Sequence, residues 1–367
     1  MLGTARLLAA IACLLTAASA RKNLIVDTDL FSDCDDAAAL LLAATFPEVN
    51  LLGVHINSRS SYSVLAASAI LSHYGHSQVP VGARRPLDDA SFFDNWTKRL
   101  GEFASKLATH WPKSMSDAEE AWDPVELYRK LLAGADDGSV TIASIGFLHN
   151  LSGLLNSTAD SHSRLAGHEL VRAKVRELVV MGGDYPQGHE FNFWGDDPYT
   201  TAHVVHNWNT PVVYAGYSLG ASVLSGGPLM ADGPKTDPVR AAYILYTYYQ
   251  PRWSFDPIAM LYAVGGLGEY FRYGNEFGYN TITLHNDSGG CSGCNVWVFD
   301  PNVTNQHWLD TTVSYERLEK ELDRLYVLGA ESSGRSSDPV GSLPKFGDCR
   351  PEAPASFSCP RETRLVK

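Results

Sequence analysis

Short apolar runs rich in Val, Ile and Leu alternate along this chain with segments of helical periodicity. The apolar runs predict strands at Asn23–Asp27, Asn50–Asn57, Gln78–Gly82, Thr141–Ile145, Glu177–Met181 and Pro211–Ala215. Helical patterns cover Asp36–Ala44, Ser63–His73, Asp237–Tyr249, Asp256–Val264 and Tyr315–Gly329. Because strands that alternate with helices are typical of βαβ units, the sequence predicts an α/β fold with an open, mostly parallel, Rossmann-like sheet flanked by helices.

The two ends of the chain depart from this pattern. Residues 1–20 contain one charge, Arg6, an apolar run from Leu7 to Ala17 and a small-residue cleavage site, as in a secretory signal peptide. Residues 331–367 are rich in Ser, Gly and Pro and predict a C-terminal tail. We therefore expect a signal peptide over 1–20, one α/β domain over 21–330 and a tail over 331–367. Such a protein would be secreted, with no membrane attachment after cleavage.

The charge balance narrows the range of partners. The chain has 41 acidic and 29 basic residues, a formal charge of −12 that becomes −13 once Arg6 is removed. An acidic surface repels phosphate backbones, so nucleic-acid polymers are not expected to bind. Glycosylation sequons, which suit a secretory route, begin at Asn95, Asn150, Asn156, Asn286 and Asn302.

Five cysteines remain after residue 20. Cys291, Cys294, Cys349 and Cys359 form either two disulfides, paired locally or crosswise, or a zinc site. Export to an oxidising compartment favours the disulfides. Cys34 is then unpaired, and we interpret it as a small buried residue.

An aspartate cluster follows the first predicted strand. Asp27, Asp29, Asp33, Asp35 and Asp36 fall within ten residues, and a helical pattern begins at the last pair. Carboxylates this close repel one another unless a cation offsets them, and oxygen ligands suit Ca²⁺ or Mg²⁺. In open α/β sheets, ligands bind beyond the carboxyl ends of the strands, which is where this cluster falls. The simpler alternative is an Asp-rich turn that caps the helix without metal.

Four segments together are similar to one enzyme family, the nucleoside hydrolases of the inosine–uridine type, in a secreted, fungal-like form. They cover most of residues 23–330 in the family's order: Asp27-x-Asp29 with Asp35-Asp36-Ala37, Ile145-Gly-Phe-Leu-His-Asn-Leu151, Val180-Met-Gly-Gly183 with Glu190-Phe-Asn192, and Phe255-Asp256-Pro257.

The resemblance implies calcium-dependent hydrolysis of the N-glycosidic bond of ribonucleosides. Ca²⁺ would be held by Asp29, Asp36, the main-chain carbonyl of Ile145 and Asp256, and Asp29 would act as general base towards water.

The resemblance also assigns the sugar-binding residues. Asp35, Glu190 and Asn192 would bind ribose hydroxyls, with Met181 packed under the sugar. The partner is then a small nucleoside, and a homo-oligomer is compatible with the family.

The departures from the family concern the base and the first loop. Phe255 stands where some members have a histidine that protonates the leaving base. Purine-selective members instead carry an aromatic residue there, which stacks on the base. We therefore expect a preference for purine nucleosides. Tyr185, Phe193, Trp194 and Trp253 are candidates for a second stacking face, and His149 and His189 are candidate acids.

The first loop is two residues longer than usual, with Phe31 at a common glycine position, and it leaves open whether Asp33 joins the metal. The usual Gly-Asn after the second strand is missing, and Asn57 or Ser60 is the nearest substitute.

Two other functions compete with this interpretation. Residues 24–29 also resemble the opening motif of haloacid-dehalogenase-type phosphatases, which would use Mg²⁺ and phosphorylate Asp27, although the Gly-Thr that should follow is absent. The alternative that we retain is a catalytically weak, secreted nucleoside- or ribose-binding protein.

Overall fold

The computed structural model describes residues 21–93, 100–284 and 290–332. The predicted signal peptide, the tail with Cys349 and Cys359, and the sequons at Asn95 and Asn286 lie outside these residues. Among the described residues, no helix combines the length and the apolar character that a membrane crossing requires.

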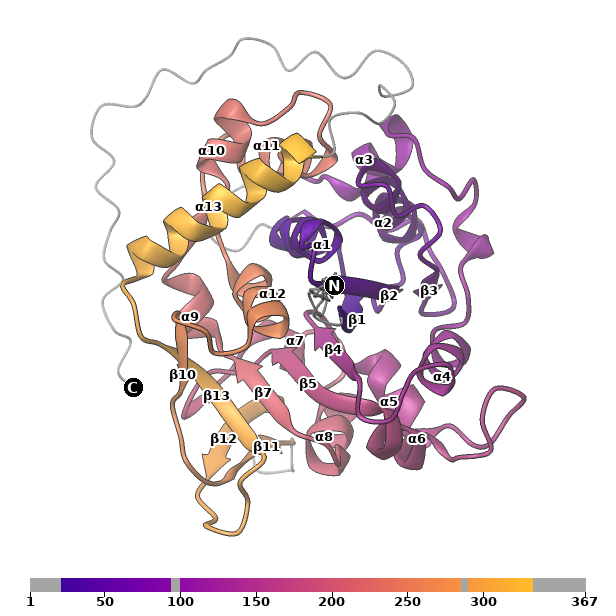
Figure 1. Ribbon diagram of the computed structural model, residues 1–367, viewed down its shortest axis with the longest axis vertical. Coiled ribbons are helices and arrows are strands. Elements are labelled where there is room, and N and C mark those ends of the chain that lie inside the picture. Colours follow the sequence, from indigo (N-terminus) through magenta and orange to yellow (C-terminus); the bar gives the residue numbers. More distant parts are fainter. Residues whose placement is uncertain (1–20, 94–99, 285–289, 333–367) are drawn as a thin grey trace, which may run out of the picture.

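Eight strands form the central sheet, in the order β10-β13-β7-β5-β4-β1-β2-β3 (Figure 1). Their bounds are β1 Lys22–Thr28, β2 Val49–Ile56, β3 Val81–Ala83, β4 Val140–Ser144, β5 Val175–Met181, β7 Val212–Ala215, β10 Phe271–Tyr273 and β13 Gln306–Thr311. Every neighbouring pair is parallel except β10 and β13. The predicted open, mostly parallel sheet is therefore confirmed.

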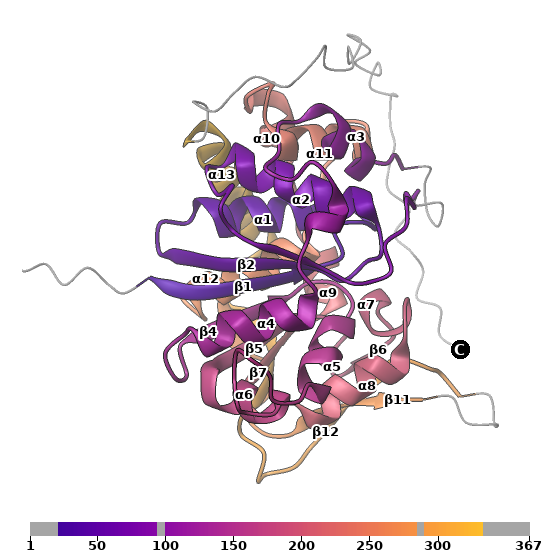
Figure 2. The ribbon, with the colours of Figure 1, turned by 90° about the vertical axis from the view of Figure 1, so that its right-hand side faces the viewer.

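Helices cover both faces of this sheet (Figure 2). One face carries α1 Asp35–Thr45, α2 Ser61–His73, α3 Ala104–His110, α10 Gly227–Asp232, α11 Pro238–Thr247, α12 Phe255–Gly265 and α13 Tyr315–Ser332. The other face carries α4 Pro124–Ala133, α5 His149–Asn156, α6 Gly167–Lys174 and α8 Pro198–Asn207. The short elements η1 Ala118–Glu120, α7 Phe191–Trp194 and α9 Tyr217–Ala221 lie in connections.

Burial explains why the middle of β1 and α1 after its first two residues are apolar. From Leu24 to Thr28, β1 is buried on both of its faces, as expected for a central parallel strand. All residues of α1 from Asp35 to Ala44 are buried, because α2, α12 and α13 pack around the helix. A helix that is apolar on all sides has to lie inside the protein, and here it lies directly behind the aspartate cluster.

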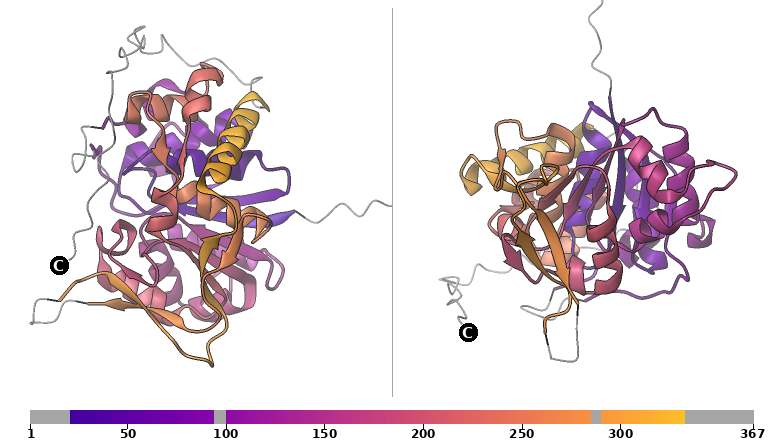
Figure 3. Two further views of the ribbon diagram at one scale, coloured as in Figure 1. Left: turned by 90° about the vertical axis from the view of Figure 1, so that its left-hand side faces the viewer. Right: turned by 90° about the horizontal axis from the view of Figure 1, so that it is seen from below.

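Two smaller sheets complete the fold. β11 Tyr279–Thr283, β12 Cys294–Val298 and β6 Gln187–Gly188 form an antiparallel sheet on the side of the molecule away from α1 and α2 (Figure 3, with β11 and β12 in orange). β8 Leu224–Ser225 pairs with β9 Arg252–Trp253 just before α12. Neither sheet was predicted from the sequence, because both consist of short strands with no regular alternation.

The strand order places a topological switch point beside β1. The chain runs from β1 to β2 and β3 on one side, and then crosses to β4 on the other side of β1. Connections diverge at such a point and leave a crevice beyond the carboxyl ends of the two strands. Asp29 directly follows β1 here, and Ile145 directly follows β4.

Candidate active site

Four carboxylates converge beyond the end of β1. Asp33, Asp35, Asp36 and Asp256 each offer an oxygen, and these oxygens all lie within 4.8 Å of one another. Asp33 lies in the loop after β1, Asp35 and Asp36 begin α1, and Asp256 is the second residue of α12. Residues separated by more than 200 positions are therefore brought to one point by the packing of α1 against α12.

Hydrogen bonds within the first loop fix its shape. The Asp36 carboxylate accepts hydrogen bonds from the Thr28 hydroxyl and from the Leu30 backbone N–H, the latter at 3.2 Å. Leu30 has a φ of 41°, an uncommon conformation for a branched residue, and its side chain is completely buried. Asp29 accepts a hydrogen bond from the Ser32 hydroxyl at 2.8 Å. Asp29 is not among the four converging carboxylates, but it lies close enough to Asp36 to raise that residue's pKa.

One buried oxygen at this point has no hydrogen-bond partner among the residues that the structure describes. The backbone N–H of Asp256 donates a hydrogen bond to Oδ2 of Asp35 at 3.1 Å, whereas Oδ1 of Asp35 is buried and has no hydrogen bond. A buried polar atom without a hydrogen-bond partner destabilises the folded protein, so this oxygen is suited to bind a cation or a hydrogen-bond donor. The converging group consists of carboxylates only, which are the donors that Ca²⁺ prefers. The residues therefore fit a calcium ion.

The electrostatics point the same way. Burial, followed by mutual repulsion, raises the pKa of Asp35, Asp36 and Asp256 well above the usual value for aspartate. Burial also raises the pKa of Asp29 to about 6. Without a counter-charge these groups favour the protonated form, so a bound cation would stabilise them as carboxylates.

Asp33 behaves differently from its neighbours because it is paired with Arg252. Nη2 of Arg252 lies 2.6 Å from Oδ2 of Asp33, and Nε lies 3.2 Å from the same oxygen. Burial works to raise the pKa of Asp33, but the adjacent guanidinium outweighs burial and leaves the pKa below its usual range. The sequence analysis missed Arg252; the lone basic residue four positions before the late aspartate was the available signal.

The turn after β4 supports the first loop from below. The backbone N–H of Ile145 donates to the Asp27 carbonyl at 2.7 Å. A Cβ on Gly146 would lie only 2.5 Å from the Asp29 backbone nitrogen, so the turn packs directly against the first loop. Asn57 ties the two together: its Oδ1 accepts from the Phe147 N–H at 3.0 Å, and its Nδ2 donates to Asp27 at 2.6 Å.

Of the two residues that the sequence offered in place of the Gly-Asn, Asn57 therefore links the first loop to the turn after β4, whereas Ser60 caps α2.

Asp27 has a structural role, which argues against the phosphatase hypothesis. Its carboxylate accepts hydrogen bonds from Asn57, from the Tyr128 hydroxyl at 2.7 Å and from Asn150 at 3.3 Å, and it is completely buried. Burial raises the pKa of Asp27 to about 7. A nucleophile needs a free oxygen that faces the substrate, and both Asp27 oxygens already accept hydrogen bonds.

Of the residues predicted to contact the sugar, Met181, Glu190 and Asn192 lie together at and after the end of β5, whereas Asp35 begins α1. Glu190 is buried, accepts hydrogen bonds from the backbone N–H groups of Gly183 (3.0 Å) and Asn192 (2.9 Å), and burial raises its pKa to about 8. Nδ2 of Asn192 donates to the carbonyl and lies 3.2 Å from the sulfur of Met181. The negative charge of Asp29 adds to the rise in the pKa of Glu190, so Glu190 and the first loop lie close to each other.

Phe255 belongs to an aromatic cluster at the start of α12. Its ring stacks on Tyr217 with centroids 5.3 Å apart and meets Trp253 at 5.8 Å. Tyr217 is 41% exposed, so the cluster has an open face. Of the residues considered for a second stacking face, only Trp253 contacts Phe255. Tyr185 stacks on Trp308, Phe193 is fully buried and Trp194 stacks on His189.

The two candidate acids lie in different surroundings. His189 is exposed and its ring lies on Trp194, whereas His149 lies near Arg84 and Asp196.

The structure also shows the state of three cysteines and the position of one glycosylation sequon. Cys291 and Cys294 form the local disulfide, and Cys34 is a buried free thiol. The sequon at Asn150 was misleading, because its side chain is 1% exposed and bonded to Asp27.

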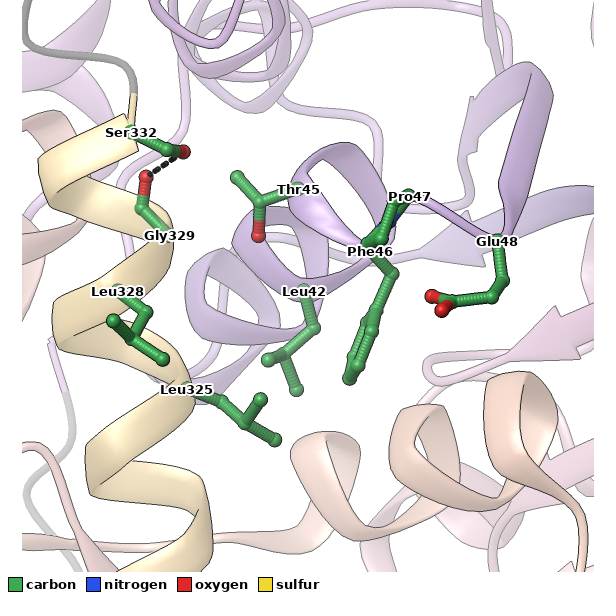
Figure 4. A pocket seen from close by; sticks show the side chains of 9 residues that line it. All are labelled: Leu42, Thr45, Phe46, Pro47, Glu48, Leu325, Leu328, Gly329 and Ser332. Carbon is green, nitrogen blue, oxygen red and sulfur yellow. Dashed lines mark hydrogen bonds between the residues drawn. The ribbon is translucent and has the colours of Figure 1, made fainter.

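Two cavities lie near α1, at opposite ends. A cavity of about 190 Å³ adjoins the first loop and is lined by Phe31, Ser58, Arg59, Ser60, Arg84, Asp88, Ala90, Phe147 and Asp196. Ser58 also donates to the Asp29 carbonyl at 2.7 Å, so this cavity borders the carboxylates. A cavity of about 280 Å³ lies at the other end of α1, between Phe46 and Leu325 of α13 (Figure 4). Only the first is positioned to extend the site.

Comparisons with known proteins agree with this geometry. The family model described as "Inosine-uridine preferring nucleoside hydrolase" matches residues 24–319. Pyrimidine-specific ribonucleoside hydrolase RihB of Escherichia coli (strain SE11) is 26% identical over 54% of this chain and 60% of its own length. The inosine-uridine preferring nucleoside hydrolase of Crithidia fasciculata is 25% identical over 62% of this chain and 71% of its own length. The match thus spans about three fifths of the first of these relatives.

Solved structures share the fold. The purine-preferring ribonucleoside hydrolase from Gardnerella vaginalis superposes with a TM-score of 0.63 at 18% identity, covering 85% of this chain and all of that one.

Proposed function

The chain belongs to the inosine-uridine preferring nucleoside hydrolase family, and on that premise we propose that it hydrolyses the N-glycosidic bond of ribonucleosides with the help of a calcium ion. The products are ribose and the free base. The observation that carries the proposal is the convergence of buried carboxylates at the switch point, with one oxygen of Asp35 left without a partner.

The carboxylates other than Asp33 each have a part in this reaction. Asp29, Asp36, Asp256 and the carbonyl of Ile145 would hold the ion, which when bound offsets the negative charge and favours deprotonation of water at the site. Asp29, held by its hydrogen bond from the Ser32 hydroxyl, accepts the proton of the attacking water. The surrounding carboxylates favour the positive charge that develops on the sugar in the transition state.

Glu190, Asn192 and Asp35 bind and orient the ribose. Glu190 and Asn192 are held by the turn at Gly183 and by Met181, so their polar atoms are already positioned before substrate arrives. Preorganised hydrogen-bonding groups of this kind select against analogues that lack a hydroxyl, because a buried group would remain unpaired. Met181 forms the apolar floor beside them.

The aromatic cluster supports a preference for purine nucleosides. A stacked Phe255 with Tyr217 and Trp253 beside it offers a broad face for a bicyclic base. The relatives named above include pyrimidine-specific and inosine-uridine preferring enzymes, so base preference rests on this cluster. The disulfide between Cys291 and Cys294 supports secretion, since such bonds persist in oxidising compartments.

A direct assay tests the proposal. The protein would be produced through a secretory host, and ribose release would be measured from inosine, adenosine, guanosine, uridine and cytidine, with calcium and with a chelator. The matched variants are Asp29→Ala and Asp232→Ala; Asp232 is an exposed aspartate of α10. We expect chelator-sensitive release that is lost in Asp29→Ala and retained in the control.

The other outcomes discriminate between functions. If the protein binds calcium but releases ribose from none of these nucleosides, the hydrolase proposal is rejected in favour of a nucleoside- or ribose-binding protein. Release that is fastest from uridine or cytidine would refute the purine preference but not the enzyme. Size-exclusion chromatography of the same material would show whether it forms a homo-oligomer.

A further inference from the structure

The ion pair between Asp33 and Arg252 lies inside the carboxylate group and has no role in the proposed reaction. One oxygen of Asp33 lies within 4.8 Å of ligand oxygens on Asp35, Asp36 and Asp256. By distance alone, Asp33 would be a fourth carboxylate ligand. Its Oδ2 nevertheless accepts two hydrogen bonds from Arg252, at 2.6 and 3.2 Å, and both side chains are largely buried.

The surroundings of Arg252 hold the guanidinium in place. Arg252 belongs to β9, which pairs with β8, and its partner in the register is Ser225. Its guanidinium carbon lies 4.8 Å from the Trp253 ring centroid and 5.4 Å from that of Tyr246. A guanidinium between two aromatic faces and a carboxylate loses little further entropy when it makes its hydrogen bonds. Arg252 is therefore a fixed positive charge at the edge of the carboxylate group.

We propose that Arg252 is a positioning residue that withholds Asp33 from the bound cation and thereby sets the affinity of the site for calcium. This inference rests on the proposed calcium site. In the absence of Arg252, the Asp33 carboxylate would be free to turn towards the ion and add a ligand and a negative charge. With Arg252 in place, the pair is close to neutral and the ion is left with the remaining carboxylates.

The two charges act on the ion in opposite directions. A cation is attracted by Asp33 and repelled by Arg252, and a divalent ion about 6 Å from a unit charge interacts with it by about 1.4 kcal/mol even at the dielectric constant of water, so each effect corresponds to at least about tenfold in affinity. Because the effects oppose one another, removing the pair together should change little. Removing either member alone should shift the affinity, with opposite signs for the two.

A double-mutant cycle tests this inference. The variants are Arg252→Gln, Asp33→Asn, the double variant and the charge-conserving Arg252→Lys. The measurement is the calcium dissociation constant by isothermal titration calorimetry, on purified full-length protein stripped of metal. Thermal unfolding in chelator provides the check that each variant is folded. Binding is measured without substrate, so the result does not depend on turnover.

We expect Arg252→Gln to bind calcium about tenfold more tightly and Asp33→Asn about tenfold more weakly. The double variant and Arg252→Lys should fall within threefold of the unsubstituted protein. If Asp33 were a direct ligand, the double variant would still lack that ligand and would bind calcium more than threefold more weakly than the unsubstituted protein, and the proposal would be wrong. Equal calcium affinity in all variants, with changes only in thermal stability, would likewise reject it in favour of a simple structural clamp.

The failure of the proposed function gives a different result. Calcium binding without nucleoside hydrolysis would reject the hydrolase and leave the cycle interpretable. If the unsubstituted protein bound no calcium, both the proposed site and this inference would be overturned.

Discussion

Replacing Asp256 by asparagine should have opposite effects on stability with and without calcium. Its carboxylate is buried with those of Asp35 and Asp36, and the oxygens lie within 4.8 Å of one another. Two unit charges at that distance repel by about 3 kcal/mol at an effective dielectric constant of 20. Protonation relieves part of this repulsion in the metal-free protein, so we expect Asp256→Asn to stabilise that form by about 1–2 kcal/mol.

Calcium reverses the sign of the effect. An ion present at one hundred times its dissociation constant stabilises the folded protein by about 2.7 kcal/mol. Asp256→Asn removes a charged ligand and should lose most of this gain. At about 2–4 °C per kcal/mol, the variant should melt a few degrees above the unsubstituted protein in chelator and several degrees below it in calcium.

The dependence on pH provides a second check. Burial and the neighbouring charges raise the pKa of Asp256 in the folded state, so the group favours folding when it is protonated. In chelator, this contribution is fully present below the pKa of the unfolded state and is lost as the pH rises through the raised folded pKa. The melting temperature of the unsubstituted protein in chelator should therefore fall more steeply with rising pH than that of Asp256→Asn.

The assay is thermal unfolding followed by circular dichroism, in chelator and in calcium, at several pH values. Asp232→Asn is the control, since that exposed aspartate lies in α10 away from the site. Equal destabilisation of Asp256→Asn in chelator and in calcium would refute the reasoning, because it would mean that the carboxylate stabilises the fold without an ion.

Three further predictions address other parts of the molecule. Phe255→Ala should lower kcat/KM for inosine and adenosine by up to about tenfold and for uridine by less, because a stacked ring contributes about 0.5–1.5 kcal/mol. The control Phe299→Ala, which removes a ring that is 72% exposed, should change kcat/KM for none of these nucleosides. Equal losses of kcat/KM for all bases would exclude stacking. His55 is buried against Tyr128 and burial lowers its pKa to about 3, so the folded protein loses stability as the pH falls from about 6.5 towards 3. His55→Leu should reduce the loss between pH 7.5 and pH 5 by about 2 kcal/mol in urea unfolding, and an unchanged loss would contradict the buried neutral histidine. The Asn295 side chain accepts a hydrogen bond from the Asp184 N–H at 2.9 Å and donates one to the Asp184 carbonyl at 2.7 Å. Asn295→Ala should therefore loosen the turn before Glu190 and raise KM about tenfold, while the calcium affinity measured by calorimetry stays the same. A parallel loss of calcium affinity would point to general unfolding.

The sequence was sufficient for the elements that depend on local pattern. The central parts of β1, β2, β4, β5 and β7 are buried on both faces, so each strand contains a short apolar run that can be recognised without knowing its neighbours. β3 was placed a few residues early, at Gln78–Gly82 instead of Val81–Ala83. Pro80, which has no N–H to donate, precedes the strand, and its carbonyl accepts from Val54.

The parts that depend on distant contacts could not be read from the sequence. Arg252 was missed because nothing near it in the chain indicates Asp33, which lies 219 positions away. Whether Asn57 or Ser60 contacts the first loop could not be read from the sequence, because the answer depends on where the turn after β4 packs. In the β11–β12 hairpin, β11 contains few apolar residues, and in β12 buried and exposed positions follow no regular order, so no strand pattern can be recognised there from the sequence.

The two aspartates of the first motif illustrate how one short sequence serves two physical purposes. Asp27 is the last but one residue of β1, and its carboxylate meets Tyr128 of α4 and Asn150 of α5 on the face opposite α1. Asp29 lies beyond the end of the strand, where the chain has turned towards α1 and the carboxylate group.

Burying Asp27 is costly, yet its hydrogen bonds connect β1, β2, α4 and α5 beneath the site. A rigid polar layer there fixes the ends of the strands from which Asp29 and Ile145 emerge. The position of the chemistry is thus determined by a carboxylate that takes no part in it, and for that reason substitutions of Tyr128 or Asn150 belong with those of the site itself.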